Sequence, residues 1–176
     1  RSAPASGAEF ERVFAERRRE ADEFYDRVTP DHLCEDEQRV IRQAMAGMLW
    51  SKQYYYFDVD RWLTEHGSNP VRGEFLRRTR NVDWFHMRNA HVISMPDKWE
   101  YPWYAAWDLA FLVLALTLVD PDFGKQQLKL MLRERYMHPN GQIPAYEWNF
   151  GDVNPPVHAW STNFTYRLEA VERGEA

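Results

Sequence analysis

The feature that most constrains the fold is an apolar run from Leu109 to Val119, which is eleven residues long and has one hydroxyl group, on Thr117. A helix that crosses a membrane needs about 20 apolar residues, so this run is too short to span a bilayer. A helix that is hydrophobic on every side is normally buried on every side. The run therefore predicts a central core helix, within about residues 104–119, that other helices must cover.

Helical periodicity recurs along most of the chain. From Glu9 to Val28 apolar residues are spaced by three and four, which indicates an amphipathic helix that ends at Thr29-Pro30. No strand-like alternation persists, so the predicted fold class is all-α, built from helical hairpins. We expect one helical domain over residues 1–176 with a loose N-terminal end at residues 1–8. The other predicted helices cover residues 35–54, 58–65, 121–136 and 157–172.

The charge and the cysteine content of the chain limit the partners and the cellular location that we expect for it. The formal net charge is −5, and the two arginine clusters, at residues 17–19 and 77–80, lie among acidic or polar residues. Nucleic-acid-binding proteins usually carry a basic stripe, so no nucleic-acid partner is expected. A single cysteine, Cys34, and the lack of a visible secretory signal favour a cytoplasmic location. No membrane partner is expected either.

The first candidate site is a dense aromatic segment between Met95 and Phe111. Aromatic rings match the flat C–H faces of sugars, and Tyr and Trp add a polar tip to an apolar body. Acidic neighbours, among them Glu100, supply acceptors for sugar hydroxyls. The segment therefore predicts a saccharide-binding wall, whose aromatic members are Trp99, Tyr101, Trp103, Tyr104, Trp107 and Phe111.

Core packing is the alternative interpretation of this segment. Trp103, Trp107 and Phe111 are spaced by four and would lie along one face of a helix. Aromatic residues at that spacing usually belong to a core. Two prolines, Pro96 and Pro102, would stiffen the approach to the helix, which is typical of a shaped pocket edge. The sequence leaves both interpretations open.

Asp108 is the sharpest single candidate, because it stands at the start of the apolar helix between Trp107 and Leu109. As a structural residue it would be a helix cap or an acid of the first turn. As a functional residue it would be a general acid, since apolar neighbours raise the pKa of a carboxyl group. A helix N-terminus lowers that pKa. The sequence does not decide between the two effects.

The second candidate site is a proline-stiffened stretch from Pro139 to Pro156. It combines amide, acidic and aromatic side chains, notably Gln142, Glu147 and Trp148, as a sugar-binding rim does. The alternative is a polar surface loop. His86 and His91 are too sparsely placed for a metal site. No cofactor motif is present, so neither a metal nor a cofactor is expected.

At these two stretches the chain resembles glycoside hydrolase family 63, in its bacterial branch, whose members are similar to mannosyl-oligosaccharide glucosidases. The resemblance covers about residues 35–160 and is strongest over 95–160. It implies an α/α toroid of the (α/α)6 barrel type, the six-hairpin glycosidase fold. The matching segments are Trp50–Asp58, Met95–Phe111, Val119–Phe123 and His138–Trp160.

The resemblance also implies a hydrolase of carbohydrate metabolism that cleaves α-glucosides or related oligosaccharides with inversion. Asp108 matches the family's catalytic acid, and the nearby aromatic residues would form the sugar subsite. Inversion needs a second carboxyl group roughly 6.5–9.5 Å from the first. The family's base is a Glu far downstream that has no match here. We therefore expect about half of the barrel, inactive alone.

Two further expectations follow. An incomplete barrel would expose apolar faces, through which the chain would self-associate. The alternative to a glycosidase is a non-catalytic carbohydrate-binding or structural helical module. Such a module would bind an oligosaccharide or small glycoside without turnover, or would use its aromatic residues only for packing.

Overall fold

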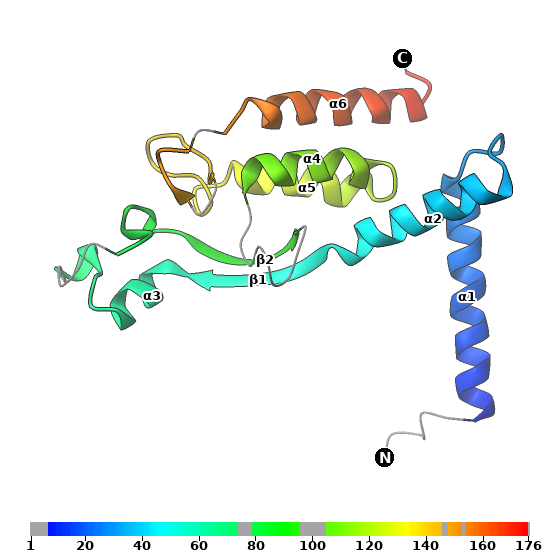
Figure 1. Cartoon of the computed structure of the whole chain (residues 1–176), viewed down its shortest axis with the longest axis horizontal. Coiled ribbons are helices and arrows are strands. Elements are labelled where there is room, and N and C mark those ends of the chain that lie inside the picture. The colour runs from blue at the N-terminus through cyan, green and yellow to red at the C-terminus, as the bar shows by residue number, and fades with distance from the viewer. Residues whose placement is uncertain (1–6, 74–78, 96–104, 146–147, 153, 176) are drawn as a thin grey trace. The chain divides into compact units, whose positions relative to one another are not determined.

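The computed structural model describes residues 7–73, 79–95, 105–145, 148–152 and 154–175. The chain divides into two compact units, Arg1–Ala46 and Gly47–Ala176. Figure 1 labels the helices and strands of both units.

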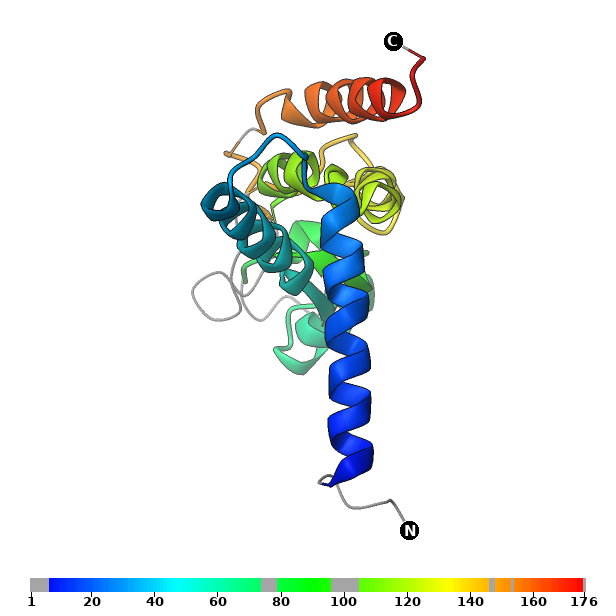
Figure 2. The ribbon, with the colours of Figure 1, turned by 90° about the vertical axis from the view of Figure 1, so that its right-hand side faces the viewer.

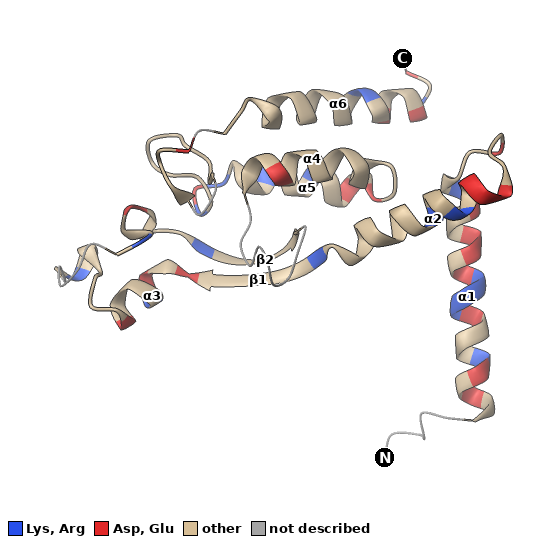
Figure 3. Cartoon of the chain, in the orientation of Figure 1, with Lys and Arg blue, Asp and Glu red and all other residues tan. Residues whose placement is uncertain are grey.

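The first unit consists of α1 (Ala8–Val28) and most of α2 (Glu35–Trp50). Within it, Arg42 donates a hydrogen bond to Asp22 (2.6 Å) and lies over the Tyr25 ring at 4.7 Å. The predicted first helix is confirmed, and it ends before Pro30 as expected. Charges of both signs cover α1, as Figure 3 shows. The expected loose end lies largely outside the described residues, and Ala8 already belongs to α1.

A two-stranded antiparallel sheet occupies a region where only helices and loops were expected. Strand β1 (Lys52–Asp58) pairs with β2 (Arg88–Ser94), so that Tyr55 stands opposite His91. The second helix therefore ends at Trp50 and does not continue to Tyr54. Aromatic residues favour strands, and the run from Tyr54 to Phe57 supplies four of them.

The prediction of an all-α toroid, about half of an (α/α)6 barrel, is therefore wrong. The described residues form six α-helices and this sheet, a mixed arrangement of helices and strands. Period-2 alternation was hidden because β1 carries aromatic side chains on both faces, with Tyr54 exposed and Tyr55 half-buried. In β2 the polar Asn89 is buried while Val92 is exposed, which reverses the usual hydropathy pattern.

Three helices pack together beside the sheet in the second unit: α4 (Ala106–Thr117), α5 (Pro121–Met131) and α6 (Val157–Glu172). Asp120 caps α5 by accepting a hydrogen bond from the Phe123 N–H (3.1 Å). The buried Ser161 hydroxyl donates to the carbonyl of Ala110 (2.8 Å) and ties α6 to α4. Both views place α6 above the pair formed by α4 and α5 (Figures 1 and 2). The predicted helices of this region are confirmed, although α5 ends earlier than expected.

The expectation that α4 is buried on every side is wrong for the described residues. Leu109, Val113 and Leu116 are buried, but Phe111 is 48% exposed and Leu118 49% exposed. The buried residues of the helix pack on α5 and α6, and the exposed ones lie along one stripe, in which the Phe111 ring also contacts Trp160 of α6. Figure 3 shows few charges along α4.

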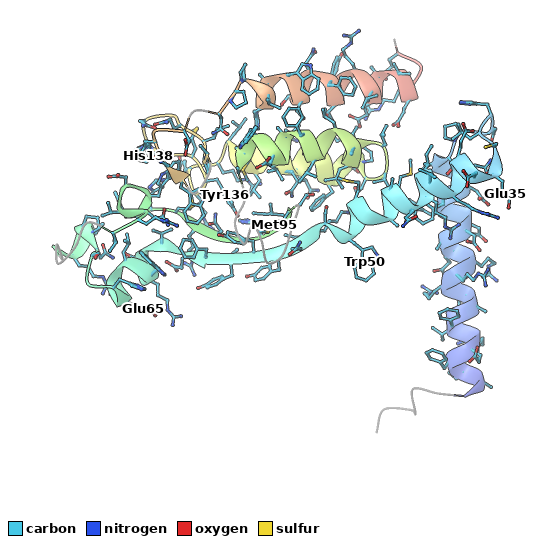
Figure 4. The ribbon with its side chains drawn as sticks, viewed as in Figure 1. Glu35, Trp50, Glu65, Met95, Tyr136 and His138 are labelled. Atoms are coloured by element: carbon cyan, nitrogen blue, oxygen red, sulfur yellow. The ribbon has the colours of Figure 1, made fainter. Side chains whose placement is uncertain are left out.

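The second unit holds two hydrophobic clusters. The first lies between the sheet and the helices and includes Met95 and Tyr136, which Figure 4 labels. The second lies around α3 (Val59–Glu65), which Asp58 caps by accepting from the Arg61 N–H. This second cluster supports the candidate site, and its buried members are Val59, Leu63, Trp84, Met87 and Trp148. None of the helices in the described ranges combines the length and the apolar character needed to cross a bilayer.

Candidate functional site

A cavity of about 570 Å³ opens between two segments that lie far apart in the sequence. One wall is formed by residues 79–84, which include the 3₁₀ turn η2 (Val82–Trp84). The other wall is formed by residues 148–152, within the second stretch that the sequence singles out. The volume lies in the range of about 300–1,000 Å³ that is usual for small-molecule pockets.

Trp84 joins the two walls. Its side chain is only 2% exposed, and its indole N–H donates to the backbone carbonyl of Trp148 (2.5 Å). The Trp84 ring stacks on Phe150 with a centroid distance of 5.3 Å. His138, labelled in Figure 4, meets the edges of both rings and contacts the Asp83 carbonyl through Nε2 (3.1 Å). The cavity therefore has a rigid aromatic floor.

Two residues that line the cavity have a left-handed backbone. Asn81 has φ 68° and Trp148 has φ 58°, and among the described residues no other non-glycine residue has positive φ. Asn tolerates this conformation, but a bulky aromatic residue there is an outlier. Trp148 is held by the Trp84 hydrogen bond and by stacking on Phe57 at 5.1 Å. Such strain concentrates at ligand-binding and catalytic sites, which supports a functional role for this cavity.

Polar groups surround the aromatic floor. Asp83, Asn149 and Asp152 are exposed at the rim, and Asn149 Oδ1 accepts a hydrogen bond from the Gly151 N–H (2.9 Å). Within the wall, Thr79 Oγ1 and Asn81 Oδ1 are buried, and neither has a hydrogen-bond partner among the described residues. This combination of aromatic faces and oxygen acceptors suits a polyhydroxylated ligand.

Most residues of the first candidate site lie outside the described residues, as does Glu147 of the second candidate site. Those of the first site are Trp99, Glu100, Tyr101, Trp103 and Tyr104. Trp107 and Phe111 lie on α4 and are 37% and 48% exposed, so neither is a fully packed core residue. Gln142 is half-buried and accepts from the Asn140 side chain (2.8 Å). Trp148 is the predicted site residue that the structure places in the cavity.

Asp108 is an acid of the first turn of α4 and does not cap the helix, because the N-cap position belongs to Ala105. Burial raises the pKa of the Asp108 carboxyl group above its usual value. Desolvation is the cause of this shift. To other described residues, the carboxyl group makes no hydrogen bond or ion pair.

The start of α4 is connected to the cavity segment through the backbone. The Ala106 N–H donates to the Pro144 carbonyl (3.0 Å), and Asn154 Nδ2 donates to the Ile143 carbonyl (2.9 Å). The two candidate sites predicted from the sequence are thus in contact through Ala106, near Asp108, and Pro144, near Trp148. Asp108 itself is not one of the residues that line the cavity.

The wall formed by residues 79–84 was not predicted from the sequence. A usable signal was Trp84 beside Asp83 and Asn81, inside a long irregular stretch. Loops of that length in a compact domain are often functional. His86 and His91 do not converge on a metal: His86 contacts the Met137 carbonyl, and His91 contacts the Tyr136 hydroxyl. Across the described part of the chain, no three His, Cys, Asp or Glu side chains gather in a metal-binding arrangement.

Comparison with known proteins gives one clear similarity. Over 166 residues, or 94% of its length, the chain is 49% identical to a Saccharomyces cerevisiae protein described as "Uncharacterized protein YMR196W". The chain spans 15% of the length of that relative. No family profile and no solved structure matches the chain.

Proposed function

We propose that the chain binds saccharides, of the α-glucoside or related oligosaccharide class, in the cavity between residues 79–84 and 148–152. The observation that carries the proposal is the composition of this cavity. Phe150, which is half-buried, provides apolar ring surface over the buried rings of Trp84 and Trp148, and the acids and amides at the rim provide hydrogen-bonding groups. Sugars combine C–H faces with hydroxyl groups, and this lining complements both.

We further propose that Asp108 is the general acid of a family 63-type inverting glycosidase. Its raised pKa and its lack of a described partner favour proton donation. The backbone contact between Ala106 and Pro144 supports a placement near the saccharide-binding segment. This proposal assigns no general base to residues 1–176, so we expect the chain alone to be inactive. The exposed free thiol of Cys34 is compatible with the proposed cytoplasmic location.

Saccharide binding is tested by titrating the chain with maltotriose and recording tryptophan fluorescence and binding heat. We expect a saturable change, because two tryptophans line the cavity. The double variant Asp83→Ala/Asp152→Ala should weaken binding about tenfold while the fold is kept, since both residues are exposed. Asp26→Asn in α1 is the matched control. A chain whose fluorescence and heat are unaffected by maltotriose would refute the proposal.

A second candidate function is saccharide binding without catalysis. It is favoured by the lining of the cavity, which does not include Asp108. Incubation with p-nitrophenyl α-glucoside tests whether the chain has catalytic activity. Robust turnover by the purified chain would contradict the expectation that residues 1–176 contain no general base. Asp108→Asn should leave maltotriose affinity largely intact under either candidate. A large loss of affinity in that variant would place Asp108 in ligand binding instead.

A further inference from the structure

Two further cavities lie beside the end of α5, away from the saccharide site. One, of about 250 Å³, is lined by residues that include His91, Lys129 and Arg133. The other, of about 510 Å³, is lined by His91, Leu132, Arg133, Glu134 and Arg135. The two cavities share His91 and Arg133. Together they form a basic pocket, defined by His91, Lys129, Arg133 and Arg135.

The positive charges of the basic pocket are not neutralised within the described residues. Neither arginine nor Lys129 forms an ion pair there, and Glu134 is the single carboxylate among the residues that line the two cavities. Elsewhere in the chain, exposed arginines such as Arg12 and Arg61 pair with a glutamate on the same helix. Uncompensated guanidinium groups around a common cavity create a site of positive potential that attracts anions.

The backbone and the imidazole of the basic pocket are held in place. The Arg133 carbonyl accepts from the Tyr136 N–H (2.8 Å) and the Met137 N–H (2.9 Å), which fixes the turn that carries both arginines. His91 Nδ1 contacts the hydroxyl of the buried Tyr136 (2.6 Å) and so has a defined orientation. Burial, and then the charges of Arg133 and Arg135, lower the pKa of His91. The imidazole and both guanidinium groups line the same cavity.

Stabilisation of the helix end is the simplest structural explanation for some of these charges. Lys129 lies in the last turn of α5 and complements the negative end of the helix. Arg135 lies four residues beyond Met131, the last residue of α5, and that effect fades within the last turn. The helix therefore does not account for the second arginine of the cavity.

We propose that the basic pocket binds a phosphate-type dianion, either as inorganic phosphate or as the phosphomonoester of a small molecule. Arginine is suited to this ligand because its planar guanidinium group donates two parallel hydrogen bonds to phosphate oxygens. The chain's net charge of −5 makes a polymeric nucleic acid an unfavourable occupant. This site is independent of the proposed saccharide site, since the two share no lining residue.

The test is a set of calorimetric titrations of the whole chain at constant ionic strength. Inorganic phosphate, glucose 6-phosphate and glucose are the three probes. We expect saturable binding of one or both phosphates with millimolar affinity or better, and we expect the double variant Arg133→Gln/Arg135→Gln to bind at least about tenfold more weakly. Arg18→Gln in α1, which has no ion pair with a described residue, is the matched control and should bind as the parent does. Circular dichroism confirms that each variant is folded.

The three probes distinguish a free anion, a phosphomonoester and a sugar as the ligand. Phosphate binding alone identifies the free anion as the ligand, and binding of glucose 6-phosphate alone identifies a phosphomonoester. The inference is overturned if neither phosphate binds below about 10 mM, or if the double variant retains full affinity. Binding of glucose that survives the double variant belongs to the saccharide site. Failure at either site leaves the result at the other unchanged.

Discussion

Replacing Trp84 by phenylalanine tests the central feature of the candidate site, which is the contact between its two walls. The substitution keeps an aromatic ring on Phe150 but removes the indole N–H that donates to the Trp148 carbonyl at 2.5 Å. Trp148 then loses one of the contacts that hold its left-handed backbone, while the stacking on Phe57 and the hydrogen bond from its N–H to the Ala145 carbonyl remain. We expect both the stability of the second unit and its saccharide affinity to fall.

The expected loss of stability follows from two contributions. A buried carbonyl that loses its donor costs about 1–3 kcal/mol. Trp84 is 2% exposed, so the smaller ring also leaves a cavity, which adds about 1 kcal/mol. The free energy of unfolding should therefore fall by about 2–4 kcal/mol. Domains of ordinary stability have about 5–15 kcal/mol, so the variant should still fold.

The assay is urea denaturation followed by far-ultraviolet circular dichroism, which does not depend on tryptophan emission. With a urea dependence of about 2 kcal/mol per molar, the middle of the usual range, the midpoint should fall by about 1–2 M. Trp160→Phe is the matched control, because Trp160 is 49% exposed and, within the described part of the chain, its ring contacts Phe111 and Phe164. It should change stability by less than about 0.5 kcal/mol. Equal midpoints for the two variants would refute the argument that Trp84 holds the cavity together.

Two other measurements test features of α4. The raised pKa of Asp108 means that the folded state binds its proton more tightly than the unfolded state, so the free energy of unfolding falls as pH rises from the unfolded pKa, near 3.8, through the folded pKa. Asp108→Asn should remove this fall and stabilise the chain at pH 7 in thermal or urea melts, by no more than about 0.5 kcal/mol because solvent screens this partly exposed group; a variant less stable than the parent at pH 7 would contradict the reasoning. The exposed Phe111 and Leu118 predict concentration-dependent self-association in analytical ultracentrifugation, which Phe111→Ser should reduce. A parent chain that stays monomeric at high concentration would count against it.

The helices could be predicted from the sequence, whereas the sheet could not. Periodic apolar spacing located α1 closely, because that helix carries its own pattern, and the predicted bounds of α6 also match. Strand β1 depends on a partner that begins at Arg88, and its tyrosines obscure the alternation of faces. The full exposure pattern of α4 was also not predictable. The sequence of an apolar helix shows which side chains could be buried. Which of them are buried depends on the neighbouring elements, and these are set by the whole fold.

The candidate site was predictable in part. Trp148 was identified from its setting among amides, acids and prolines, and it lines the cavity. The opposite wall was missed because its contribution depends on a bond between Trp84 and a carbonyl 64 positions away. The positive φ of Asn81 leaves no mark on composition or periodicity. The direction of the Asp108 pKa shift likewise needed the actual burial of the carboxyl group.

The two walls of the cavity come from segments that are far apart in the sequence, and this couples ligand binding to folding. Because residues 79–84 and 148–152 come together only when the chain is folded, the unfolded state offers no comparable receptor. Any molecule that occupies the cavity must therefore shift the folding equilibrium, by about 2.7 kcal/mol at a hundredfold excess over its dissociation constant. The melting temperature therefore rises with occupancy of the cavity. A collection of sugars can be ranked by the shift in melting temperature that each produces, before any reaction is known.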